Sequence, residues 1–125
     1  MILDTNAVSA SLGGDKALAQ VLRGAPRHHL PVPVIGEYQF GLLALRQERR
    51  YRELFRKLEA ESIVLCPERE TADHYAAIRF DLKQRGRPIP ENDLWIAALA
   101  RQHSLAIVSN DVHFDHVGGV RRVGW

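Results

Sequence analysis

The 125-residue chain contains only one cysteine, Cys66, so no disulfide can form within it. A sequence this poor in cysteine is typical of a reducing compartment. No stretch approaches the roughly 18 uninterrupted apolar residues of a membrane span. Residues 1–4 offer neither the basic region nor the apolar run of a signal peptide. These absences predict a cytoplasmic protein.

Common ligand-binding motifs are also missing. The chain has neither the G-x-x-x-x-G-K-[ST] nor the G-x-G-x-x-G pattern of a phosphate-binding glycine loop. His113 and His116 have an H-x-x-H spacing, and His28 and His29 are adjacent. A closed zinc site needs several His or Cys ligands, and a single cysteine without a helical H-E-x-x-H motif does not supply them. We therefore expect His113 to be a loop residue at the rim of a site of another kind.

The size and composition of the chain are those of one ordinary globular domain spanning residues 1–125. Hydrophobic residues make up 46% of the chain and charged residues 26%, with a formal net charge of only +2. The cations are clustered, and the clusters comprise Arg46, Arg49, Arg50, Arg52, Arg56 and Lys57, and then Arg79, Lys83, Arg85 and Arg87. Such clusters are typical of solvated helix faces as well as of phosphate-binding surfaces, so charge alone does not decide between the two.

The apolar residues indicate an α/β fold. Short apolar runs that do not alternate, at residues 2–3, 63–66 and 105–108, predict buried strands. Residues 30–33 contain two prolines, so we expect an edge strand or a loop there, and a last short strand is predicted within residues 119–123. Helical periodicity and capping residues predict helices at residues 7–12, 15–23, 34–45, 47–60, 70–84 and from residue 91 onward, with Trp95 and its neighbours in the core. Buried strands separated by helices predict a parallel sheet covered on both faces.

Four acids map to one edge of this sheet. Asp4 ends the first strand, and Asp111 follows the strand at residues 105–108. Glu37 and Asp93 are each expected in the first turn of a helix. In right-handed βαβ units, the strands end and the following helices begin at the same edge, where open α/β sheets bind their ligands. An acid at a helix start or a strand end is common for structural reasons, but four at one edge are not.

Converging carboxylates repel one another, so a fold that gathers four of them is expected to bind a cation there. Oxygen ligands suit Mg²⁺ or Mn²⁺. Such an ion neutralises the charge on a phosphodiester and activates a water for hydrolysis. Thr5, Asn6, Asn92 and Ser109 lie beside the acids and are candidates to orient them or to bind water, although capping and turn formation also explain such residues. For Asn92, and for Asn110, the capping or turn interpretation is the stronger.

The same residues resemble the PIN-domain family and, within it, the VapC-type toxins. The similar segments are residues 1–6, 34–37, 90–98 and 109–114, which carry Asp4, Glu37, Asp93 and Asp111 in order. The resemblance implies a three-layer fold with a parallel sheet of about four or five strands flanked by helices. It also implies a Mg²⁺- or Mn²⁺-dependent endoribonuclease, a homodimer and a small antitoxin partner. Some relatives carry the last acid slightly later, so Asp115 is a second candidate beside Asp111.

In this interpretation RNA lies across the acidic edge. Its phosphates would be steadied by arginines, for which Arg46, Arg49 and Arg87 are the candidates, and nothing in the sequence names the RNA that is cleaved. Two alternatives remain open. A PIN-like domain without catalysis would act as a binding scaffold. A phosphohydrolase resembling the haloacid dehalogenases would also begin with a strand-end Asp, but that resemblance expects a second Asp where this chain has Asn6.

Overall fold

A computed structural model describes residues 1–125. A five-stranded sheet lies at its centre, with strand order β3-β2-β1-β4-β5 and every neighbouring pair parallel. The strands are β1 (Ile2–Leu3), β2 (His29–Pro31), β3 (Ile63–Leu65), β4 (Ile107–Val108) and β5 (Arg122–Val123). The parallel α/β architecture predicted from the apolar runs is therefore confirmed.

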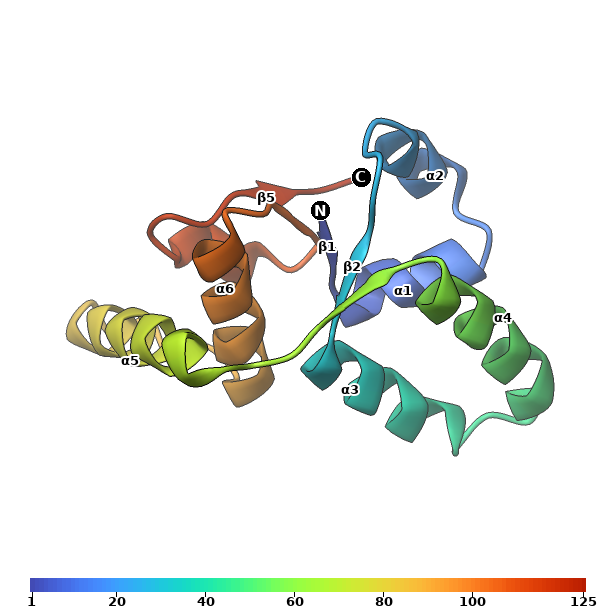
Figure 1. The fold of residues 1–125 in the computed structure, drawn as a ribbon, viewed down its shortest axis with the longest axis horizontal. Helices are drawn as coiled ribbons and strands as arrows, with labels where there is room; N and C mark the ends of the chain where they lie inside the picture. Colours follow the sequence, from blue (N-terminus) through green and yellow to red (C-terminus); the bar gives the residue numbers. More distant parts are fainter.

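Six α-helices connect and flank the strands: α1 (Thr5–Leu12), α2 (Lys16–Arg23), α3 (Val32–Leu42), α4 (Glu48–Ala60), α5 (Arg69–Gln84) and α6 (Glu91–His103). A short 3₁₀ helix, η1 (Val112–His116), follows β4. In Figure 1, α5 and α6 lie to the left of β1 and β2, whereas α1, α2 and α4 lie to the right. None of these helices combines the length and the apolarity that crossing a membrane requires.

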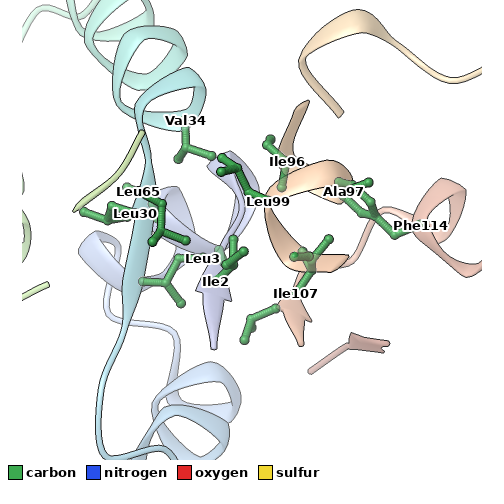
Figure 2. Close-up of a cluster of buried hydrophobic side chains, with 14 of the residues drawn as sticks. Ile2, Leu3, Leu30, Val34, Leu65, Ile96, Ala97, Leu99, Ile107 and Phe114 are labelled. Atoms are coloured by element: carbon green, nitrogen blue, oxygen red, sulfur yellow. The ribbon is translucent and has the colours of Figure 1, made fainter. Parts of the chain in front are cut away.

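The core is formed by the central strands and the helices packed on them. Figure 2 shows side chains from β1, β2 and β4 meeting those of α3 and α6, with Phe114 of η1 beside Ala97. The middle of α6 is apolar on every side, and all its residues from Leu94 to Ala100 except Trp95 are buried. Trp95 is half-buried and stacks on Tyr75 of α5, with ring centroids 4.2 Å apart. The predicted burial of this helix is confirmed, but the prediction that Trp95 itself lies in the core is wrong, since it packs at the edge against α5.

The prediction that the proline-containing segment forms an edge strand or a loop is wrong, because β2 lies inside the sheet between β1 and β3. Pro31 is the last residue of β2, and the pairing of β2 with β1 is recorded only at His29 and Ile2. The missing N–H of Pro31 therefore falls where this pairing has ended. Pro31 also caps α3, whose first turn contains Pro33, a position where a helix tolerates proline. The chain thus passes from β2 into α3 without a loop.

Residues 63–65 form a strand as predicted, but the prediction that this strand is buried is wrong. β3 forms the edge of the sheet, and Ile63 and Val64 are 38% and 41% exposed, whereas Leu65 is buried. An apolar run does not distinguish an edge strand from a central one, because both have the same local sequence preferences. The order of the strands decides their burial, and that order depends on contacts far apart in the sequence.

Candidate active site

The four acids singled out from the sequence meet at one pocket. Asp4 caps α1 directly after β1, and Asp111 caps η1 after β4. Asp93 lies in the first turn of α6 as expected. Glu37 lies in the second turn of α3 and not in the first, because α3 already begins at Val32. The pocket has a volume of about 620 Å³ and is lined by Asp4, Thr5, Asn6, Ser9, Glu37, Pro90, Glu91, Asn92, Asp93 and Asp111.

Asp4 is the most enclosed of these acids, with only 5% of its surface exposed. Its Oδ2 accepts hydrogen bonds from the hydroxyl of Ser109 at 2.7 Å and from the side-chain amide of Asn6 at 2.8 Å. Ser109 is also completely buried, so both ends of the shorter bond are shielded from water. Two donors on one carboxylate oxygen fix the rotamer of Asp4, and no side chain donates to Oδ1.

Ser109 and Asn6 connect the two strand ends. The Ser109 hydroxyl, which donates to Asp4, accepts from the backbone N–H of Asp111 at 2.9 Å. Asn6 donates to the same hydroxyl at 2.9 Å and accepts from the backbone N–H of Asn110 at 3.2 Å. Thr5 donates to Oε2 of Glu37 at 2.9 Å and thereby holds α3 against α1. The polar residues predicted to orient the acids therefore contact them, with Asn92 as the exception: it is exposed and lines the pocket.

The carboxylates alter one another's ionisation. Burial raises the pKa of Asp93 to about 6, with further increases caused by Asp4, Asp111 and Glu37. Burial also raises the pKa of Asp4 above 3.8, although the hydrogen bonds from Ser109 and from the backbone of Thr5 oppose the change. No lysine or arginine lines the pocket. The charge of these acids is therefore not balanced by any cationic side chain in the lining.

The donor set fits a hard divalent cation better than any other ligand. No group of three or more Asp, Glu, His or Cys side chains is close enough to hold one ion entirely by protein ligands. Mg²⁺ commonly takes only one or two carboxylates and keeps several waters, so a wide acidic pocket is compatible with it. His113 lies at the rim, where its Nδ1 is 2.7 Å from Oδ1 of Asp111.

Sequence reasoning missed two polar residues of the lining. Ser9 lies four residues after Thr5 on α1, a spacing that places both on one helix face. Because the helix was predicted to begin at residue 7 and not at residue 5, the sequence did not show that Thr5 and Ser9 share a helix face. Glu91 also lines the pocket, but it accepts a hydrogen bond from the Tyr75 hydroxyl and lies 3.6 Å from Arg79, so its charge is compensated.

Other candidates lie outside the lining. Asp115, the alternative last acid, pairs with Arg122 through two hydrogen bonds of 2.9 Å. Of the three arginines proposed for RNA, Arg49 lies 3.7 Å from Glu53 and Arg87 lies 3.4 Å from Nε2 of His116. Arg46 is exposed just before α4. The structure thus brings together the four acids and their polar neighbours but does not place these arginines beside them.

Replacing Asp93 by asparagine is expected to stabilise the metal-free protein at pH 7. Because the pKa of Asp93 rises from 3.8 to about 6 on folding, the folded state retains a proton that the unfolded chain has released. Stability is therefore lost as the pH rises from about 4 to about 6 and stays lower above that range. At 1.36 kcal/mol per unit the full effect would be about 3 kcal/mol. Solvent screening at this half-exposed side chain reduces the expected effect to about 1 kcal/mol.

Urea unfolding of wild type and Asp93→Asn in EDTA, at pH 4 and pH 7, measures this effect. At pH 4 the folded Asp93 is protonated, so its favourable charge in the first turn of α6 is lost only at pH 7, where the loss offsets part of the gain; the raised pKa shows that burial and repulsion outweigh it. The sign of the pH dependence is unaffected by that loss. A variant whose stability relative to wild type did not increase between pH 4 and pH 7 would show that Asp93 is not strained by its neighbours.

Together, the parallel sheet and the acidic pocket at its carboxyl edge define a nuclease-like α/β domain. The model of the PIN domain family matches residues 1–120, and the chain therefore belongs to the PIN domain family. It is 29% identical to Ribonuclease VapC5 of Mycobacterium tuberculosis, over 98% of this chain and 90% of that protein. It is 40% identical over 63 residues to the tRNA(fMet)-specific endonuclease VapC of Shigella flexneri, a match that covers 50% of this chain and 48% of that protein.

Solved structures share the fold over nearly the whole chain. DNA-bound VapBC from Salmonella typhimurium superposes with a TM-score of 0.89 at 22% identity, over 99% of this chain and 96% of that one. VapBC-5 from Mycobacterium tuberculosis gives a TM-score of 0.74 at 28% identity, over 99% and 97% of the two chains. The PIN fold with about four or five parallel strands that the resemblance implied is thus confirmed, and the sheet has five. Membership of this family replaces the haloacid-dehalogenase alternative.

Proposed function

We propose that this protein is a VapC-type endoribonuclease, the toxin component of a toxin–antitoxin pair, and that it requires Mg²⁺ or Mn²⁺. The observation that carries this proposal is one pocket in a PIN domain whose lining contains four acids without a cationic partner in the lining, a fifth acid, Glu91, that pairs with Arg79, and no lysine or arginine. Relatives that match this chain are named as ribonucleases and as an endonuclease specific for a tRNA. The substrate class is therefore RNA.

Each side chain has a distinct part in this function. Asp4 lines the pocket and is held by Ser109 and Asn6 through Oδ2, so its Oδ1 is the oxygen proposed to bind the cation. Asp93 and Asp111 face the same space from α6 and from the end of β4, and are the other candidate metal ligands. Glu37, oriented by Thr5, is the more exposed acid and is suited to holding a water or a proton near the scissile phosphate. A bound divalent ion would neutralise phosphate charge and lower the pKa of water.

RNA must reach the pocket across a surface that can hold phosphates. Arg46 directly follows Leu45, which lines a second hollow of about 240 Å³ that shares Thr5, Ser9 and Glu37 with the acidic pocket. Arg87 precedes the loop that ends in Pro90, a residue of the pocket lining. Arg49, on α4, extends the basic surface beyond Arg46. These three arginines are proposed to contact phosphates, and loss of each should reduce the salt dependence of RNA affinity.

A homodimer and an antitoxin are proposed as protein partners. Phe40 and Leu43 near the end of α3, and Phe80 on α5, are 76%, 70% and 64% exposed. Apolar side chains this exposed are typical of surfaces that are covered in an assembly. The structural relatives include toxin–antitoxin complexes. Light scattering on the purified protein, alone and with a coexpressed antitoxin, measures both assemblies, and a monomer that no antitoxin binds would contradict this part of the proposal.

The experiment that tests the function is cleavage of a structured RNA pool that includes transfer RNAs. Wild type is expected to cut in Mn²⁺ and to stop in EDTA, and Asp93→Asn should be inactive in both. Mapping the ends of the products identifies the target sequence. Isothermal titration of Mn²⁺ in the absence of RNA separates the remaining outcomes. Carboxylate-dependent Mn²⁺ binding without cleavage would indicate an RNA missing from the pool, whereas no binding and no cleavage would favour a binding scaffold.

A further inference from the structure

Arg122 does not line the pocket, but its guanidinium makes three hydrogen bonds beside it. Its Nε and Nη2 donate to the two oxygens of Asp115, each at 2.9 Å, in a bidentate pair. Its Nη1 donates to the backbone carbonyl of Ser109 at 3.0 Å. The side chain of Arg122 is only 20% exposed, and that of Asp115 is 48% exposed. A bidentate arginine with a third bond to a carbonyl is fixed in direction as well as in position.

The backbone around Arg122 holds the same segment. Ser109 donates its N–H to the carbonyl of Val123 at 3.0 Å, and Asn110 Oδ1 accepts from the N–H of Trp125 at 3.2 Å. At Gly124 a Cβ would lie 2.9 Å from Nη1 of Arg122, so a larger residue there would displace the guanidinium. The chain from Arg122 to Trp125 therefore holds Ser109 through both its N–H and its carbonyl.

Ser109 is the residue that transmits this constraint to the acids. Fixing its N–H and carbonyl leaves its backbone little freedom, and its hydroxyl is then directed at Asp4 Oδ2, 2.7 Å away. The same hydroxyl accepts the N–H of Asp111 at 2.9 Å, which sets where Asp111 leaves the strand. Ser109 therefore sets the position of Asp4 relative to Asp111, and Arg122 in turn fixes the position of Ser109.

We propose that the Arg122–Asp115 ion pair, called the clasp below, fixes the position of residues 109–111. Asp4 and Asp111 would then bind one cation from the ends of the adjacent strands β1 and β4. This inference rests on the proposed metal-dependent nuclease. It assigns Asp115 to the support of Arg122 and not to the metal. Arg122 is accordingly a positioning residue that touches neither substrate nor metal.

The clasp is tested first by hydrogen exchange of the metal-free protein, a measurement independent of nuclease activity. Arg122→Gln removes the bidentate pair and the bond to the Ser109 carbonyl, and amide exchange over residues 109–114 should accelerate about tenfold or more. The matched control is Arg121→Gln, which removes the same charge. Arg121 is exposed and its side chain makes no hydrogen bond. Equal exchange in both variants would overturn the proposal, whether or not wild type cleaves RNA.

Mn²⁺ affinity then distinguishes position from charge. Losing a positive charge from the protein should not by itself weaken cation binding, so Arg121→Gln is expected to leave Mn²⁺ affinity equal or higher. Arg122→Gln should instead lower it about tenfold, in the range found when partners that orient metal ligands are removed. If wild type proves active, kcat should fall in Arg122→Gln with KM almost unchanged, and Arg122→Lys should recover part of it. Unchanged Mn²⁺ affinity in Arg122→Gln would contradict the clasp.

A double-mutant cycle decides the role of Asp115. If Asp115 acts only through Arg122, Asp115→Asn should be milder than Arg122→Gln, because the bond to the Ser109 carbonyl remains. Combining the two changes should then weaken Mn²⁺ binding no further than Arg122→Gln alone, a non-additivity expected of contacting residues. Additive losses, or complete loss in Asp115→Asn by itself, would instead make Asp115 a metal ligand and refute the assignment.

Discussion

Replacing Asp4 by asparagine is expected to slow metal-dependent RNA cleavage about a thousandfold. A bound metal contributes several kcal/mol to charge stabilisation in hydrolysis, and each 1.36 kcal/mol corresponds to a factor of ten in rate. Ser109 and Asn6 both donate to Oδ2 of Asp4, so an asparagine would keep its oxygen there. Its NH₂ group would then point into the pocket and oppose a cation.

The fold should survive this substitution, because the hydrogen bonds of Asp4 to Ser109 and Asn6 can be kept. Burial of the charged carboxylate raises its pKa, so the neutral amide also removes an unfavourable charge. Asp73→Asn, an exposed acid on α5 paired with Arg69, is the matched control and should cleave like wild type. Rates are measured on one mapped RNA with Mn²⁺. An Asp4→Asn variant that binds Mn²⁺ and cleaves at the wild-type rate would remove Asp4 from the mechanism.

Replacing Phe114 by alanine is expected to destabilise the protein by about 3–5 kcal/mol, the usual range for a buried phenylalanine. Phe114 is completely buried, and Figure 2 shows it beside Ala97 of α6. It lies three residues after Asp111, to whose carbonyl its N–H is bonded at 3.4 Å. Its side chain therefore fastens the turn that carries the last acid to the helix that carries Asp93.

Urea unfolding measures this loss, with Val112→Ala as the control in the same 3₁₀ helix. Val112 is 58% exposed, and its truncation should change the free energy of unfolding by no more than about 0.5 kcal/mol. Similar values for the two variants would mean that η1 is not anchored by Phe114. The comparison uses neighbouring residues of one short helix, so differences in helix propensity contribute little.

The candidate site was more predictable from the sequence than the details of the sheet. The convergence of Asp4, Asp93 and Asp111 follows from strand ends and helix starts sharing one edge, a rule that needs only the order of the elements. The interior position of β2 was not predictable, because Pro31 has no backbone N–H to donate to a neighbouring strand. Only the structure shows that the pairing of β2 with β1 has already ended at Pro31, so that this N–H is not needed. The exposure of Ile63 likewise depends on which strand lies at the edge.

Within the site, the missed features were those that depend on helix boundaries and on long-range side-chain contacts. Placing the start of α1 two residues late hid Ser9, and placing the start of α3 two residues late put Glu37 in the wrong turn. The pairing of Asp115 with Arg122 has no local signal, since a carboxylate seven residues from an arginine can form many alternative contacts. Such contacts are set by the packed tertiary structure.

The bond from Ser109 to Asp4 joins residues 105 positions apart in the chain. β1 lies between β2 and β4, so its pairing is completed only by a strand that follows much later in the chain. Contacts of such long sequence separation form late in folding. A growing chain on the ribosome would therefore carry Asp4 and Glu37 long before it had a functional pocket. For the proposed nuclease, activity would therefore begin only after the segment that carries Arg122 had been synthesised and had packed against Ser109.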